Sequence, residues 1–213
     1  MKVSQRMTLN PITASPEDNI YSVKDVMDSE KIHRLPVVDK DGVLVGIISE
    51  SDILSASPDF SSSPSIHEVA YLLSRLTVAD VMSTEVMTIS PNATVEEAAR
   101  IMVDGEISCL PVIDDGALVG LITRTDLFKL LLELLGARHY GVSANFVVKD
   151  KPGIIAEITS KLASCGIDIV SIGTMRTFSD EGLVTMKVQG ISCQELSDIL
   201  KPMVVKIEDI REV

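Results

Sequence analysis

Apolar residues recur at helical spacing in two segments of the chain, residues 20–27 and 95–102. Spacings of three and four residues place such side chains on one face of an α-helix, so each segment is predicted to form an amphipathic helix. A short strand is predicted before each helix, at residues 12–14 and 87–89. The apolar helix positions are Ile20, Val23, Val26 and Met27 in the first segment and Val95, Ala98, Ile101 and Met102 in the second.

Two aliphatic runs follow the first helix, at residues 35–38 and 44–48, with Asp41-Gly42 between them. Asp-Gly favours the positive φ angles of a tight turn, so these runs predict a β-hairpin. The Leu-Pro-Val run of this hairpin recurs 75 residues later, at residues 110–112. The chain therefore contains two copies of one unit. Neither copy can cover both faces of so small a sheet, so the two are expected to pack into one globule.

Two further helices are predicted outside the repeated pattern. Between the copies, Ser65-Ile66-His67-Glu68 has the pattern of a capping box, and apolar residues continue at helical spacing as far as Leu76. After the second copy, residues 127–135 are apolar on nearly every side, and Gly136 is a plausible C-cap. This second helix is expected to need burial by another domain or chain.

The pattern changes at residue 142. The C-terminal part predicts the order β-α-β-β-α-β, which is the ferredoxin-like split arrangement. The fold class predicted for the chain is thus α/β, of the α+β kind, with a repeated N-terminal part and a ferredoxin-like C-terminal domain. The predicted elements are strands at residues 143–148, 169–175, 183–188 and 204–210, and helices at 154–164 and 193–200.

Composition narrows the possible partners. The 213 residues carry a formal net charge of −12 and are only 3% aromatic, which disfavours a nucleic-acid partner because such binding depends on clustered Lys and Arg. The three cysteines are widely separated, so neither a disulfide framework nor a thiol metal site is suggested. The N-terminus lacks an apolar signal core, and the apolar run at 127–135 is too short to span a bilayer. We expect a cytoplasmic protein without a membrane partner.

Hydroxyl and carboxyl side chains follow the second hairpin strand in both copies, as Ser49-Glu50-Ser51-Asp52 and Thr123-Arg124-Thr125-Asp126. One interpretation is helix capping, for which Ser, Thr and Asp are favoured. The other is a ligand site, in which the carboxylate accepts from ribose hydroxyls while hydroxyls and helix-start amides hold phosphate. Capping accounts for one hydroxyl per helix but does not require the whole pattern twice.

The repeat closely resembles the CBS motif, named from cystathionine β-synthase, because a Leu-Pro-Val hairpin and a terminal Gly-x-Ile-Ser/Thr-x-Ser/Thr-Asp occur twice in register. The resemblance implies CBS motifs at residues 1–60 and 78–135, joined by a partly helical connector at 61–77 and packed as one Bateman module. Such modules bind AMP, ATP and other adenosyl compounds. The resemblance therefore implies that an adenosine nucleotide is a regulatory ligand of this protein.

The resemblance also implies roles for particular residues. Asp52 and Asp126 would bind ribose, neighbouring hydroxyls would contact ribose or phosphate, and adenine would lie against residues 12–14 and 87–89. His33-Arg34 matches a His-Arg pair that contacts phosphate in the γ subunit of AMP-activated protein kinase. The candidate nucleotide-binding residues are Ile12, Thr13, Ala14, His33, Arg34, Pro36, Ser49, Ser51, Asp52, Met87, Thr88, Ile89, Pro111, Thr123, Arg124, Thr125 and Asp126.

The two candidate sites differ in charge. Glu50 adds a negative charge to the first and Arg124 a positive charge to the second, so phosphate should prefer the second. The alternative for Glu50 and Arg124 is that they pair with each other or with water. Likewise, His33 and Arg34 could form only a solvated helix end.

Residues 149–158, with Gly166-Ile167-Asp168-Ile169 after the next helix, resemble the start of an ACT domain, a regulatory module that usually works as a dimer and often binds an amino acid. The resemblance implies an ACT domain at 142–213 after a linker at 136–141. Its ligand would lie near Asp150, Lys151, Pro152 and Gly153, where the bared amides of a helix start suit a carboxylate. A turn that only starts the helix is equally open.

No sequence feature indicates catalysis: the three histidines are isolated, and no triad order, Gly-rich phosphate loop or metal-ligand set stands out. We predict a non-catalytic regulator that senses AMP, ADP, ATP or S-adenosylmethionine, requires no cofactor, and signals to the ACT domain or to a metabolic enzyme. The order of CBS pair and ACT domain is similar to acetoin-utilisation AcuB-type proteins, which implies a role in acetoin or central carbon metabolism.

The apolar helix at 127–135 and an exposed sheet edge further predict a homodimer. Three alternatives stay open. The protein could be a dimeric scaffold without a ligand, an amino-acid sensor acting through the C-terminal domain, or an enzyme with an unrecognised site.

Overall fold

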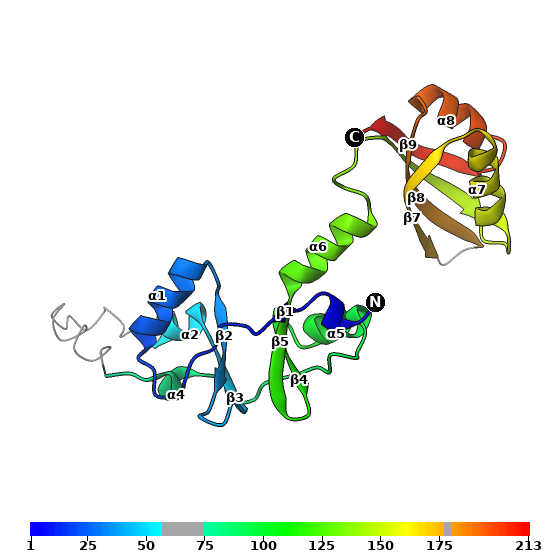
Figure 1. Ribbon diagram of the computed structural model, residues 1–213. Coiled ribbons are helices and arrows are strands. Elements are labelled where there is room, and N and C mark those ends of the chain that lie inside the picture. Colours follow the sequence, from blue (N-terminus) through cyan, green and yellow to red (C-terminus); the bar gives the residue numbers. More distant parts are fainter. Residues whose placement is uncertain (57–74, 177–179) are drawn as a thin grey trace. The chain divides into compact units, whose positions relative to one another are not determined.

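The computed structural model describes residues 1–56, 75–176 and 180–213. The chain forms two compact units, Met1–Leu127 and Phe128–Val213. Both copies of the repeat lie in the first unit except for the end of the second copy, and the ferredoxin-like pattern lies in the second unit (Figure 1). The helix predicted from Ser65-Ile66-His67-Glu68 to Leu76 lies almost wholly at residues 57–74, outside the described residues.

In the first copy, the elements follow the order predicted from the sequence. Helix α1 buries Ile20, Val23 and Met27, whereas Val26 is 36% exposed. The two strands of the hairpin pair antiparallel, and Gly42 in the turn has a φ of +79°. The elements are α1 (Ile20–Glu30), β2 (Arg34–Val38), β3 (Leu44–Ser49) and α2 (Glu50–Ser55).

The second copy repeats this arrangement. Its helix α5 buries Val95, Ala98 and Met102, and its two strands also pair antiparallel. A short helix precedes it, and a longer helix leaves it. The elements are α4 (Val78–Val81), α5 (Val95–Asp104), β4 (Cys109–Asp114), β5 (Ala117–Thr123) and α6 (Arg124–Leu134).

The predicted strands at residues 12–14 and 87–89 are wrong in extent, because each reduces to a single parallel bridge. Ala14 bridges Val37, and Ile89 bridges Val112. A parallel ladder continues through alternate residues, and in both copies the residue two positions further on is proline, which has no N–H to donate. The ladder therefore stops after one residue.

The segment that leads into each copy pairs with the sheet of the other copy. Strand β1 (Thr8–Leu9) lies near the start of the first copy but pairs antiparallel with β5 of the second. In return, Ser83 lies near the start of the second copy and bridges Ile47 in β3 of the first. Val78, at the start of α4, is completely buried in the core of the first copy. The two copies are thus completed by each other, as the burial argument predicts.

The C-terminal unit has the predicted β-α-β-β-α-β order. Its sheet has the strand order β7-β8-β6-β9 with every pair antiparallel, which is the ferredoxin-like arrangement. Alternate residues of β6 and β8 pack against α7 and α8 in one apolar core. The elements are β6 (Val142–Lys149), α7 (Ile154–Ser164), β7 (Asp168–Arg176), β8 (Glu181–Gln189), α8 (Cys193–Leu200) and β9 (Lys206–Glu212).

The segment after α6 is bound to strands of the C-terminal unit. Gly136, at a φ of +59°, lets the helix end as predicted, with Ala137 N donating to Leu132 O. The buried Lys187 then donates from Nζ to the carbonyls of Gly136 at 2.8 Å and His139 at 3.1 Å. The segment expected to be a linker is therefore held by side chains of β8.

No helix within the described ranges is both long enough and apolar enough to cross a membrane.

Candidate functional site

The hydroxyl and carboxyl residues at the end of each hairpin cap the following helix. Ser49 is the N-cap of α2, and both its N–H and its hydroxyl donate to Asp52 Oδ2, at 2.8 and 2.7 Å. In the second copy, Thr123 donates to Asp126 Oδ2 in the same way, at 2.9 and 2.6 Å. The capping interpretation thus applies to both copies.

Capping uses only one oxygen of each carboxylate. All the hydrogen bonds that these two carboxylates accept from Ser49 and Thr123 end on Oδ2, and a carboxylate offers about four lone-pair sites on its two oxygens. The Ser51 hydroxyl lies 2.8 Å from the Ser49 hydroxyl, so it too is oriented by the cap. Each helix start therefore holds a carboxylate in a fixed orientation, and its Oδ1 atom can still accept a hydrogen bond.

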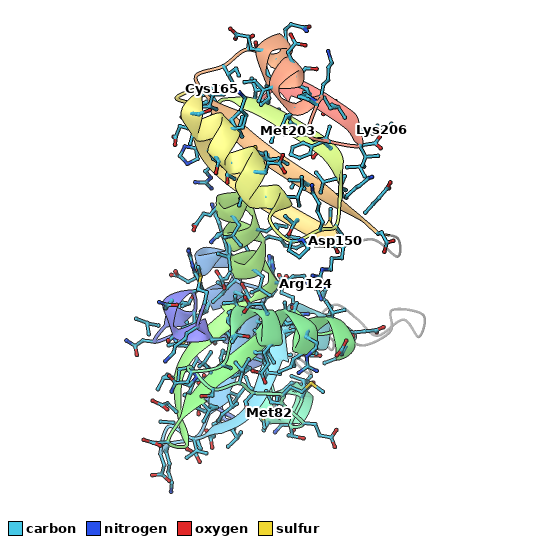
Figure 2. The ribbon with its side chains drawn as sticks, turned by 90° about the vertical axis from the view of Figure 1, so that its right-hand side faces the viewer. Met82, Arg124, Asp150, Cys165, Met203 and Lys206 are labelled. Atoms are coloured by element: carbon cyan, nitrogen blue, oxygen red, sulfur yellow. The ribbon has the colours of Figure 1, made fainter. Side chains whose placement is uncertain are left out.

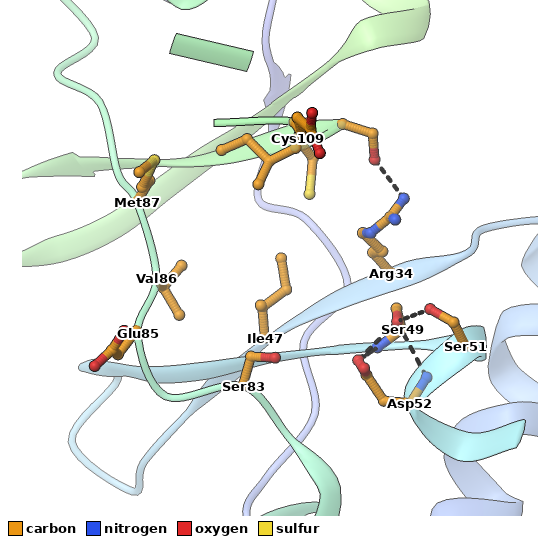
Figure 3. Close-up of a pocket in the computed structure, with 13 residues that line it drawn as sticks. Arg34, Ile47, Ser49, Ser51, Asp52, Ser83, Glu85, Val86, Met87 and Cys109 are labelled. Carbon is orange, nitrogen blue, oxygen red and sulfur yellow. Dashed lines mark hydrogen bonds between the residues drawn. The ribbon is translucent and has the colours of Figure 1, made fainter. Parts of the chain in front are cut away.

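Asp52 lines a cavity of about 320 Å³ between the two copies of the repeat (Figure 3). This volume is at the lower end of the range of about 300–1,000 Å³ for small-molecule sites. Both copies contribute polar side chains to the lining, and the second copy adds apolar and sulfur-containing ones. The lining residues are Arg34, Ile47, Ser49, Ser51, Asp52, Ser83, Glu85, Val86, Met87, Glu106, Ile107, Ser108 and Cys109.

Five of the predicted site residues line this cavity together: Arg34, Ser49, Ser51, Asp52 and Met87. They come from three separate segments, residues 34, 49–52 and 87, so folding brings together what the sequence separates. The Arg34 guanidinium donates to the Ser108 hydroxyl and so joins the two copies across the cavity (Figure 3).

The other predicted residues do not line this cavity. Pro36 and Pro111 are buried, and their carbonyls accept from Ala14 and Ile89, each at 3.0 Å. Ile12 is exposed, as are Thr13 and His33, and Thr88 lines a smaller cavity of about 210 Å³. Thr123, Arg124, Thr125 and Asp126 lie together at the start of α6.

The predicted contrast between Glu50 and Arg124 takes a different form. Glu50 pairs with His33 at 2.6 Å and Lys24 at 3.2 Å, so its negative charge is directed to its own copy. Hydrogen bonds from His33 and then Lys24 lower the pKa of Glu50. Arg124, at the start of α6 (Figure 2), donates to Ile107 O at 3.0 Å. The alternative that these two residues pair with each other is therefore wrong.

Eight residues of the cavity were missed by sequence reasoning. Burial raises the pKa of one of them, Cys109, which keeps its thiol neutral. The 75-residue offset could have found some of the eight, because Cys109 corresponds to Arg34 and Ser108 to His33. Residues 83–87 lie beside the first copy because the start of each copy, its lead-in segment, pairs with the other copy. No sequence pattern comparable to the 75-residue offset predicts this exchange.

A second cavity of about 320 Å³ lies in the C-terminal unit. Of the predicted residues, Asp150, Lys151 and Gly153 line it and Pro152 does not. Asp150 lies in the loop before α7 (Figure 2) and pairs with Arg176 at 3.5 Å. Gly153 has a φ of +90° and is the N-cap of α7 without a side-chain cap. The described residues contain no group of three or more His, Cys, Asp or Glu that could hold a metal ion.

The comparisons with known proteins agree with this geometry. The family model of the CBS domain matches residues 3–59 and 78–133, which is more than half of the chain. An acetoin utilization protein (AcuB) from Vibrio cholerae has a similar structure, with a TM-score of 0.55 and 31% identity over 65% of this chain and 95% of that one.

Two similar structures contain adenosine compounds according to their descriptions. CBSX2 in complex with AMP has a TM-score of 0.51 and 26% identity, over 62% of this chain and 96% of that chain. The CBS domain pair of protein MJ0100 is in complex with 5′-methylthioadenosine and S-adenosyl-L-methionine. It has a TM-score of 0.51 and 29% identity, over 62% of this chain and 99% of that chain.

Proposed function

Because this chain belongs to the CBS-domain family, we propose that its paired motifs bind adenosine ligands and regulate the C-terminal unit or a partner. The candidate ligands are AMP, ADP, ATP and S-adenosylmethionine. The complexes of CBSX2 with AMP and of the MJ0100 pair with S-adenosyl-L-methionine support this ligand class. The protein then acts by binding alone, without a catalytic step.

The observation that carries the proposal is the capped carboxylate beside the cavity. Ribose presents two neighbouring hydroxyls, which donate well to a carboxylate. Asp52 is fixed through Oδ2 by Ser49 and keeps Oδ1 for a ligand. Asp126 is fixed in the same way by Thr123. Each motif thus supplies one ribose-binding carboxylate whose orientation is set before the ligand arrives.

Thermal unfolding with and without AMP tests this proposal. A ligand that binds only the folded protein raises its stability, by about 2.7 kcal/mol at 100 times Kd. We expect AMP and S-adenosylmethionine to raise Tm in the wild type, and the double variant Asp52→Asn/Asp126→Asn to lose the increase. Asparagine is chosen over alanine because its amide oxygen can still accept from the capped N–H groups.

Asp80→Asn is the matched control. Asp80 accepts from the N–H and hydroxyl of Thr77, both at 2.8 Å, in the same cap geometry at the start of α4, but it does not line the cavity. This control should lower the Tm of the free protein while keeping the ligand-induced increase. An unchanged increase in the double variant would contradict the assignment, and no increase in the wild type would favour a scaffold without a ligand.

We further propose that α6 transmits ligand binding at Asp126 to the C-terminal unit. Thr125 and Asp126 lie in the first turn of α6, and Lys187 binds the carbonyls just after its end. A ligand on Asp126 would therefore act on a helix whose other end is fixed to the C-terminal unit. We propose that this unit is of the ACT type and that the output reaches a metabolic enzyme in the cytoplasm. The likeness to AcuB supports acetoin metabolism as its setting.

The C-terminal cavity supports a second candidate function, the sensing of an amino acid. Gly153 leaves the first amides of α7 without a side-chain cap, and these can accept a carboxylate. Asp150, which lines the cavity, could hold an ammonium group if it exchanged its pair with Arg176. Titration with a panel of amino acids, in wild type and in Asp150→Asn, tests this candidate.

A further inference from the structure

The charges around the Asp52 cavity are unbalanced. Its lining includes one cationic side chain, Arg34, and three carboxylates, Asp52, Glu85 and Glu106. Arg34 is already engaged with the Ser108 hydroxyl. Among the described residues, Glu85 and Glu106 have no ion-pair partner that would neutralise them. The cavity therefore has an excess of negative charge when it is empty.

The two glutamates are not repeated at the corresponding positions of the first copy. Glu106 corresponds to Lys31 at the 75-residue offset, and the backbone confirms the match, because both residues follow a helix with positive φ, +52° and +56°. At the same offset, Glu85 corresponds to Asn10, and Ser108 to His33. The two positions that carry carboxylates in this cavity therefore carry an amide and an ammonium group in the first copy, and the position of Ser108 carries an imidazole.

We infer that the Asp52 cavity selects adenosine derivatives whose 5′ substituent is neutral or cationic and disfavours 5′-phosphates. This inference rests on the proposed function. A cavity of about 320 Å³ is on the order of 9 Å across, close to the Debye length of about 8 Å at physiological salt. A charged group near the centre of the cavity therefore lies within one Debye length of the lining, where Glu85 and Glu106 repel phosphate and attract a sulfonium or ammonium group.

Calorimetric titration of the full chain tests the inference. In an Asp126→Asn background, only the Asp52 cavity should bind, and three probes differ in their 5′ charge: AMP is anionic, 5′-methylthioadenosine is neutral and S-adenosylmethionine carries a sulfonium. We expect the last two to bind at least tenfold more tightly than AMP. Adding Glu85→Gln and Glu106→Gln should strengthen AMP binding by about tenfold, weaken S-adenosylmethionine binding by about threefold and leave the neutral probe unchanged.

The control is Asp25→Asn/Glu97→Gln, which removes the same charge from two exposed residues outside the cavity. It should leave the ratio of AMP to 5′-methylthioadenosine affinity unchanged. Equal affinities for those two probes in the Asp126→Asn background, or a ratio unaltered by the two Gln substitutions, would overturn the charge selection while leaving adenosine binding intact. If none of the probes binds the wild type, the proposed function itself fails, and the inference fails with it.

Discussion

Capping and ligand binding can use the same side chains at the residue scale. The helix caps explain Ser49 and Thr123 fully, since each satisfies amide groups that would otherwise lack a partner. They do not explain why the capping carboxylate of Asp52 lines a cavity. The cap also means that replacing Asp126 with alanine would cost helix stability as well as ligand binding. A ligand response is therefore best measured against the stability of each unliganded variant.

Glu50 gives a prediction about pH. Hydrogen bonds from His33 and Lys24 lower the pKa of Glu50, so the folded state stabilises the ionised carboxylate more than the unfolded state does. This contribution to stability is complete above the ordinary Glu pKa of about 4.3 and is lost as the pH falls below it. Glu50→Gln should therefore lower Tm at pH 7, and the difference from wild type should shrink towards pH 3.

The matched control is Glu30→Gln, which removes the same charge from an exposed residue at the end of α1. It should leave Tm nearly unchanged at every pH. If the Tm of Glu50→Gln stays below that of the wild type by the same amount at pH 3 as at pH 7, the ion pairs of Glu50 do not stabilise the fold.

At the scale of elements, the exchange of lead-in segments depends on two glycines. A Cβ on Gly46 would lie 2.5 Å from Met82 Sδ and 3.0 Å from the carbonyl of Ser83. A Cβ on Gly120 would meet Met7 and Thr8 in the same way, at 2.5 and 3.0 Å. Both glycines lie where the lead-in segment of the other copy crosses the hairpin. The absence of a side chain there permits the close backbone approach.

Substitution of these glycines should weaken the pairing between the copies. Because both a sulfur and a backbone carbonyl would have to move, we expect Gly46→Ala and Gly120→Ala each to destabilise the first unit by about 1–3 kcal/mol. Chemical denaturation measures this loss. Gly182→Ala is the control, since its Cβ would find no atom closer than 3.6 Å. Equal stability of all three variants would contradict the close-approach argument.

At the scale of the whole molecule, α6 begins at the Asp126 candidate site, and Lys187 binds the chain just after the helix ends. Lys187 alternates with Met186 and Val188 of the core, so its side chain leaves β8 on the side away from α7 and α8. A buried ammonium group satisfied by backbone carbonyls fixes the chain more firmly than a neutral contact, because hydrogen bonds to charged groups are worth about 1.5–3 kcal/mol.

The proposed relay predicts coupling between ligand and C-terminal unit. Saturating AMP should change amide exchange across residues 154–175 of the wild type, with a coupling free energy of about 1–3 kcal/mol. Lys187→Met should remove this change while leaving AMP affinity nearly intact. Lys161→Met, on an exposed face of α7, should retain it. Identical exchange in wild type with and without AMP would mean that the two units act independently.

The exposed apolar residues of α6 predict self-association. Phe128 is 59% exposed and Leu134 60% exposed, and burying such side chains in a second copy would be favourable. Light scattering at micromolar concentration should give twice the chain mass. Phe128→Glu should shift the protein towards the monomer, whereas Tyr140→Glu, at a residue that is 87% exposed outside the helix, should not. A wild-type monomer would refute the dimer.

The sequence alone determined the repeat, the hairpins, helices α1 and α5, the order of elements in the C-terminal unit and the capped Ser-x-x-Asp and Thr-x-x-Asp segments. The repeat follows from comparing the chain with itself, and the other features depend on local periodicity or on turn and cap chemistry, which a short window of residues contains. Tertiary structure alone decided that residues 83–87 join the Asp52 cavity, that the strands at 12–14 and 87–89 shrink to one bridge each, and that Lys187 holds the chain after α6. These features depend on contacts between residues far apart in the chain, and no local pattern encodes which distant backbone will approach.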